Sequence, residues 1–233
     1  MWHSTRGIVF HSLKYSDTSM IVRIYTEMFG NQSYLVRGVR KSGSRMKPGL
    51  FQPMNLLALE VTFRERATLH SIRDVSVAET FRTIPFDIRK SAVAVFINEL
   101  AYRTIREEEP NTALFRFLWQ QCLDLDALED GIPLFHIRFI YDLMHHLGIH
   151  PRMNYSAETP VFNLREGFFQ ATIPDHPDYL EGSRSRSFAT GRPLPPVTTT
   201  NLLELLITYY RMHLPGFHGV ESLHVLQEVF APA

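Results

Sequence analysis

Residues 31–53 read NQSYLVRGVRKSGSRMKPGLFQP, the most basic stretch of the chain. Its cationic side chains fall within eleven positions: Arg37, Arg40, Lys41, Arg45 and Lys47. No acidic residue lies between Glu27 and Glu60. A strand-like run from Ser33 to Val39 leads directly into a Gly/Ser/Lys/Arg loop, so the cations lie at the end and rim of a strand. This arrangement is typical of grooves that follow a phosphate backbone, although a solvated surface loop explains the same charges.

The charge of the chain is unevenly distributed. Over all 233 residues, 24 Lys and Arg balance 24 Asp and Glu. Residues 1–80 hold 11 basic and 6 acidic side chains, a balance of +5, whereas residues 81–233 hold 13 and 18, a balance of −5. Such polarity indicates a basic binding module joined to a module that meets other partners, with a domain boundary near residue 80.

A hydrophobic period of two predicts strands throughout residues 1–80. The strand-like runs cover residues 5–13, 19–26, 33–39, 55–63 and 67–77. The second and third runs place Arg23 and Arg37 on the outer face of one sheet. Five short strands, with the longest and most basic loop after the third, predict a small closed barrel. The OB-fold is such a barrel and binds oligonucleotides, and strand counting alone does not separate it from an SH3-like barrel.

The hydrophobic period changes to 3.6 after residue 79, which predicts a helical region. Apolar stripes at helical spacing cover about 87–106, 112–123, 133–147, 201–214 and 221–230, as a helix-bundle core requires. Periodicity fades among the seven prolines of residues 150–197, where 161–173 reads as a β-hairpin and 182–192 as a solvated connector. The predicted class is therefore α+β: a five-stranded OB-fold barrel over 1–80, then a mostly helical domain over 81–233 with a Pro-rich and β-hairpin insertion at about 150–197.

The partial catalytic and metal-binding motifs of this sequence lack residues that their chemistry requires. Residues 38–45 have the glycine spacing of a P-loop, yet Ser44 replaces the required lysine and Arg45 the required Ser or Thr. The 11 histidines form no H-E-x-x-H pair, and the single cysteine, Cys122, lies on an apolar helix stripe. No set of carboxylates converges as a two-metal nuclease requires. We therefore predict no enzymatic activity, no metal and no cofactor.

The N-terminal run GIVFHSLKYSDTSMIVRIYTEMFGNQSYLVRGVRKSGSR resembles the opening of the bacterial RecO recombination-mediator family. The shared pattern is a Gly-Ile-Val start, a tyrosine turn, a strand ending in Thr, a Gly, and an Arg-Gly-x-Arg-x-x-x-Ser loop. The resemblance continues through Phe51-Gln52-Pro53, the helix at 96–100, and the Leu147-Gly148-x-x-Pro151 signature. It covers the barrel and the first three helices well and the C-terminal third loosely.

Many members of that family carry four cysteines as a zinc site after the Leu-Gly-x-x-Pro signature. Residues 154–179 of this chain contain no cysteine, so the resemblance is to a zinc-free member. We expect the hairpin at 161–173 to take over the packing role of the zinc module.

The resemblance implies a non-catalytic mediator that binds single- and double-stranded DNA and anneals complementary strands. It also implies work with RecR, and in some lineages RecF, in loading RecA onto DNA coated by the single-stranded-DNA-binding protein. Together with the absence of a signal peptide or a run of about 18 apolar residues, this predicts a cytoplasmic, nucleoid-associated protein without membrane contact.

The expected DNA contacts are the five cations of residues 37–47 together with Arg23. Five phosphate contacts on a single strand give a slope of log affinity against log salt of about −3.5. Base stacking is expected from an aromatic ring of Tyr15, Tyr34 or Phe51. By resemblance, the acidic helical domain receives the acidic, Phe-ending tail of the single-stranded-DNA-binding protein in an apolar pocket edged by Arg116 and Arg138.

Two functions of other classes fit the same residues. A structural adaptor whose barrel binds protein predicts no affinity for oligonucleotides at roughly 0.15 M salt. A nucleic-acid enzyme with an unrecognised site predicts nucleotide turnover or strand cleavage in the presence of magnesium.

Overall fold

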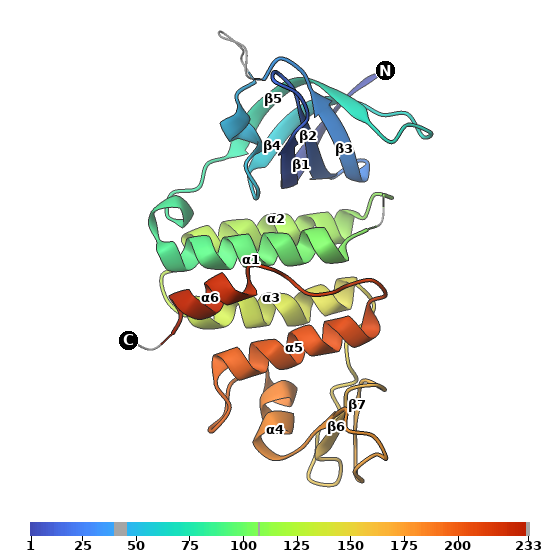
Figure 1. Cartoon of the computed structure of the whole chain (residues 1–233), viewed down its shortest axis with the longest axis vertical. Helices are drawn as coiled ribbons and strands as arrows, with labels where there is room; N and C mark the ends of the chain where they lie inside the picture. Colours follow the sequence, from blue (N-terminus) through green and yellow to red (C-terminus); the bar gives the residue numbers. More distant parts are fainter. Residues whose placement is uncertain (40–45, 107, 232–233) are drawn as a thin grey trace. The chain divides into compact units, whose positions relative to one another are not determined.

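The computed structural model describes residues 1–39, 46–106 and 108–231 (Figure 1). Its contacts divide the chain into two compact units, Met1–Leu128 and Glu129–Ala233. The hydrophobic period of the sequence changes near residue 80, but the division between the units falls later, after the second helix. The reason is that the first two helices pack with the barrel. Within the described residues, no helix is both long and apolar enough to cross a membrane.

The first unit begins with a closed five-stranded barrel, which agrees with the predicted OB-fold. Its strands are β1 (Trp2–Lys14), β2 (Met20–Thr26), β3 (Gly30–Val36), β4 (Leu56–Thr62) and β5 (His70–Glu79), in the order β1-β2-β3-β5-β4. β3 pairs with β5 in parallel, and the other neighbours pair antiparallel. The short helix η1 (Pro48–Phe51) follows the basic loop, and its Phe51 lies in the barrel core with Val22, Tyr34 and Val36.

Two helices complete the first unit. After η2 (Ile84–Phe86) come α1 (Ile88–Thr104) and α2 (Thr112–Ala127). The carboxyl group of Asp87, the N-cap of α1, accepts hydrogen bonds from the amides of Arg89 and Lys90. The N-cap of α2 is Asn111, whose side chain accepts a hydrogen bond from the Leu114 amide. The side-chain amide of Asn98 donates to the Phe10 carbonyl at 2.8 Å and so ties α1 to β1.

The second unit contains four helices and a small sheet among the residues that the structure describes. The helices are α3 (Ile132–His146), α4 (Gly182–Thr190), α5 (Thr199–His213) and α6 (Leu223–Val229). The sheet order is β7-β6-β8, from β6 (Val161–Asn163), β7 (Phe168–Gln170) and β8 (Tyr179–Leu180), so the predicted hairpin is confirmed and gains a third strand.

One prediction for this unit is wrong. Residues 182–190, expected to belong to a solvated connector, form the helix α4. Its single large apolar residue explains the difference: Phe188 is fully buried, and its ring stacks on that of Phe162 of β6 with centroids 4.3 Å apart.

Candidate nucleic-acid interface

The rim of the barrel carries the two described cations of the predicted basic cluster. Arg37 follows the last residue of β3, and Lys47 precedes η1. Both side chains belong to exposed residues, and no acidic side chain of the described residues forms an ion pair with either. The other predicted members, Arg40, Lys41 and Arg45, lie outside the described residues. Arg37 and Lys47 can therefore bind anions, and they lie at the two ends of the basic loop.

Arg23 lies on the outer face of the barrel, as the alternation predicts. Register pairs Arg23 of β2 with Ser33 of β3. The guanidinium group donates from Nε to Asn31 Oδ1 and from Nη1 to Ser33 Oγ, both at 3.0 Å. These two partners fix the direction of the side chain and, being neutral, do not compensate its positive charge.

Two of the aromatic side chains expected to stack on bases are in the interior. Tyr34 and Phe51 are both 0% exposed in the barrel core, and burial raises the pKa of the Tyr34 hydroxyl. The expectation that they stack on nucleobases is contradicted, because neither ring can reach a ligand without opening the core. Tyr34 points inward with Val36 on the alternate face from Arg37.

The third aromatic candidate, Tyr15, is 62% exposed. Register places Lys14 opposite Met20 and Met20 opposite Val36. Tyr15 follows Lys14 directly, and Arg37 follows Val36 directly. The two residues therefore lie at the same end of the barrel. An exposed ring and an exposed cation therefore share the rim, which is the combination that single-stranded nucleic acids require.

Arg6 of the barrel, by contrast, is engaged in contacts within the protein. Arg6 forms an ion pair of 2.8 Å with Glu27, and its guanidinium carbon lies 4.9 Å from the ring centroid of Trp119. Hydrogen bonds from Arg6 hold the pKa of the Glu27 carboxyl below its usual value, and the nearby charge of Arg116 contributes. Arg116 is exposed on α2 of the first unit. Arg37 and Lys47 of the rim thus differ from Arg6, whose charge is paired.

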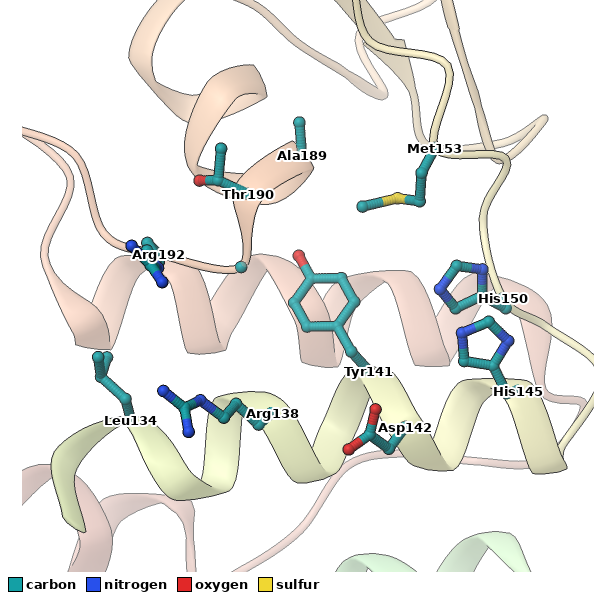
Figure 2. A pocket seen from close by; sticks show the side chains of 11 residues that line it. Leu134, Arg138, Tyr141, Asp142, His145, His150, Met153, Ala189, Thr190 and Arg192 are labelled. Carbon is teal, nitrogen blue, oxygen red and sulfur yellow. The ribbon is translucent and has the colours of Figure 1, made fainter. Parts of the chain in front are cut away.

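A pocket of about 400 Å³ lies within the second unit (Figure 2). Arg138 of α3 and Arg192, just after α4, line one end, and the imidazole rings of His145 and His150 stack at the other with centroids 3.4 Å apart. The Tyr141 ring lies between the two ends, and its hydroxyl donates to the Phe188 carbonyl. Of the two arginines predicted to edge a tail-binding pocket, Arg138 lines this pocket and Arg116 does not. Arg192 was not predicted for it.

The described residues offer no evident centre for metal chemistry. Among them, no group of three or more His, Cys, Asp or Glu is placed to hold a metal ion. Burial raises the pKa of the Cys122 thiol to about 12, so this side chain stays protonated and unreactive near neutral pH.

Comparison with known proteins links the whole chain to one family. The family model for the N-terminal part of recombination protein O matches residues 1–81, and the model for its C-terminal part matches residues 85–170. The DNA repair protein RecO of Bacteroides fragilis is 34% identical over 245 residues, which cover 99% of this chain and 100% of the relative. The DNA repair protein RecO of Flavobacterium psychrophilum is 33% identical over 243 residues, which cover 97% and 98%.

Proposed function

Because the chain belongs to the RecO family of DNA repair proteins, we propose that it is a non-catalytic recombination mediator that binds single- and double-stranded DNA through the rim of its barrel. In this proposal residues 1–80 make the DNA contacts, residues 81–233 meet protein partners, and the protein acts at the nucleoid. The observation that supports it most is the exposure of Arg37 and Lys47 without an acidic partner among the described residues.

Annealing follows from the same contacts. Each cation that neutralises a phosphate releases a counterion, which supplies affinity without reading sequence. Two complementary strands repel each other less when their backbones are screened. If the barrel grips the backbones and leaves the base edges exposed, the bases remain available for pairing. No catalytic group is needed for this activity.

The protein partners belong to the same proposal. The protein would act with RecR, and in some lineages RecF, to help load RecA onto DNA coated by the single-stranded-DNA-binding protein. The acidic, Phe-ending tail of that coating protein suits the pocket at Arg138, because Arg138 and Arg192 attract carboxylates while Leu134 and Met153 supply apolar surface. Arg116, which lies on α2, is a further candidate contact for the tail.

A filter-binding titration with a single-stranded oligonucleotide tests the DNA contact. We expect the double variant R37E/K47E to bind weakly, to lose strand annealing, and to make the slope of log affinity against log salt less negative by about 1.4. The circular dichroism spectrum should not change, because both side chains are exposed.

The matched control is R184E/R186E, which makes the same charge change at two exposed arginines of α4. Equal loss of affinity in the two double variants would mean that binding follows net charge and not the rim. If the unmodified protein has no affinity for oligonucleotides at roughly 0.15 M salt, the barrel is a protein-binding adaptor instead.

A further inference from the structure

Strand register aligns outward-facing side chains in one row across the barrel. Leu13 lies opposite Ile21, Ile21 opposite Leu35, and Leu35 beside Ser71. The row continues to β4, since the Ser71 amide donates to Thr62 Oγ1 at 3.0 Å. Thr62 in turn pairs with Trp2 at the start of β1. We call these six residues the outer row: Leu13, Ile21, Leu35, Ser71, Thr62 and Trp2.

The outer row presents apolar side chains that the barrel core does not use. The next residues along β2, β3 and β5, Val22, Val36 and Ile72, point inward and are buried. Leu13 is 47% exposed and Trp2 40% exposed, and the row between them is half-buried. Leu13, Ile21 and Leu35 are consecutive apolar members of the row, and the polar residues Ser71 and Thr62 separate them from Trp2. An exposed apolar surface edged by charge is a feature of binding sites. At about 4.8 Å between neighbouring strands, the row extends over roughly 24 Å.

The Trp2 end is held in place by a β-bulge. Opposite β4, the register of β5 passes from Ile72 directly to Asp74, so Arg73 is an extra residue. Such a bulge redirects the side chain of the extra residue. The Arg73 guanidinium lies 5.1 Å from the centroid of the Trp2 ring and is fixed by two hydrogen bonds to the carboxylate of Glu60. A fixed indole ring loses little conformational entropy when a ligand stacks on it.

Cations lie on both sides of the row, and Tyr15 stands at its other end. Arg37 is two residues after Leu35 and Arg23 two residues after Ile21, and since β2 and β3 are antiparallel, the two arginines lie on opposite edges. Two acidic groups nearby are paired, Glu60 with Arg73 and Asp17 with Lys14 at 3.1 Å, whereas Asp74, opposite Glu60, forms no ion pair among the described residues. An incoming phosphate therefore meets the guanidinium groups of Arg37 and Arg23 at the two edges, neither of which forms an ion pair with a described residue.

We propose that a single DNA strand crosses the barrel along the outer row, with one base stacked on Trp2 and another on Tyr15. This inference rests on the proposed DNA-binding function. The apolar side chains of Ile21 and Leu35 contact bases between the two rings, while Arg23 and Arg37 bind phosphates. The row accommodates a strand near the short end of the site sizes of OB-folds, about 4 to 16 nucleotides.

The intrinsic fluorescence of Trp2 reports this contact directly. The chain has two tryptophans, and the other, Trp119, is only 6% exposed. Titration with an oligothymidylate of about 8 nucleotides, within the range of OB-fold sites, should quench the fluorescence with saturation. The same titration of the W2F variant should leave the signal of Trp119 unchanged.

The affinity for the oligothymidylate and its salt dependence distinguish base stacking on Trp2 from the binding of phosphates by charge. The W2A variant should bind the oligothymidylate roughly 5- to 150-fold more weakly, as expected for the loss of one stacked base. Its salt slope should match that of the unmodified protein, because stacking releases no counterions. The matched control is F86A, which removes an aromatic ring that is 86% exposed on η2, outside the outer row, and should bind normally.

Two outcomes would overturn the inference in distinguishable ways. If the unmodified protein binds the oligonucleotide and W2A binds equally well, the strand does not cross at Trp2, although the proposed DNA binding stands. If the unmodified protein does not bind at all, the proposed function and this inference both fail. A fluorescence response only to a protein ligand would make the outer row a protein-binding surface.

Discussion

A methyl group placed on Gly30 would lie 2.4 Å from the carbonyl oxygen of Glu109. The turn between β2 and β3 therefore packs closely on the segment between α1 and α2. The neighbouring side chains reinforce this contact: Asn31 Nδ2 donates to the Ile105 carbonyl at 2.7 Å, and Gln32 Nε2 donates to the Glu108 carbonyl at 3.0 Å. The barrel and the two helices are thus held together as a single unit.

We predict that Gly30→Ala lowers the free energy of unfolding by about 3 kcal/mol, measured by urea denaturation. The left-handed backbone at φ +65° costs about 1 kcal/mol for alanine, and the clash would separate the amides of Asn31 and Gln32 from their carbonyl partners, at about 1 kcal/mol each. Gly131→Ala is the control, because its φ is +81° and its methyl group meets open space. Similar decreases in the free energy of unfolding of both variants would show that the close contact between Gly30 and Glu109 contributes nothing to stability.

The carboxyl group of Asp126, near the end of α2, organises the segment before α1. It accepts hydrogen bonds from the backbone amides of Arg82, Thr83 and Ile84 at 2.8 to 3.0 Å. The ammonium group of Lys90 donates to the Asp126 carbonyl at 2.8 Å. Burial tends to raise the pKa of the Asp126 carboxyl, but the hydrogen bonds from the three amides outweigh it, so the pKa lies below its usual value of 3.8.

Asp126→Ala should lower the free energy of unfolding by about 2 kcal/mol near neutral pH, because three amides lose a charged acceptor. A depressed pKa means that this stabilisation is present above the pKa of the unfolded chain and is lost as pH falls through the folded pKa. The difference between the two proteins should stay constant above about pH 5 and shrink below about pH 4.

The control for this measurement is Asp124→Ala on the same helix. Asp124 is exposed and accepts one hydrogen bond, from Gln120 at 2.8 Å, so its removal should change the free energy of unfolding by less than about 0.5 kcal/mol. A gap between wild type and Asp126→Ala that persists unchanged to pH 3 would contradict a role for the ionised carboxylate.

The barrel could be predicted from sequence because its strands alternate regularly. The same alternation also gives the burial of Tyr34, since a period of two that turns Arg37 outward turns Tyr34 inward. Phe51 is different. It follows Pro48-Gly49 in a segment without periodicity, so its place in the core depends on the path of η1 and has no local signal.

Two features of the structure, the β-bulge at Arg73 and the pocket at Arg138, depend on contacts between residues that are distant in the sequence. Local sequence patterns therefore could not predict them. The β-bulge at Arg73 is an irregularity of pairing with β4, and nothing in the residues 70–79 marks it. The pocket at Arg138 depends on Arg192, 54 positions later, which reaches it because α4 folds back on Phe162. Local patterns predict elements, whereas such sites arise from the packing of elements that are distant in the chain.

The pocket of the second unit provides the last prediction. An acidic peptide that ends in phenylalanine should bind there, and the double variant R138A/R192A should bind it at least tenfold more weakly, since each charge-assisted hydrogen bond contributes about 1.5–3 kcal/mol. Fluorescence anisotropy of a labelled peptide measures this affinity. The control is R184A, an exposed arginine of α4 outside the pocket lining, which should bind normally. Binding that is unaffected in R138A/R192A and reduced in R116A would move the tail site to α2.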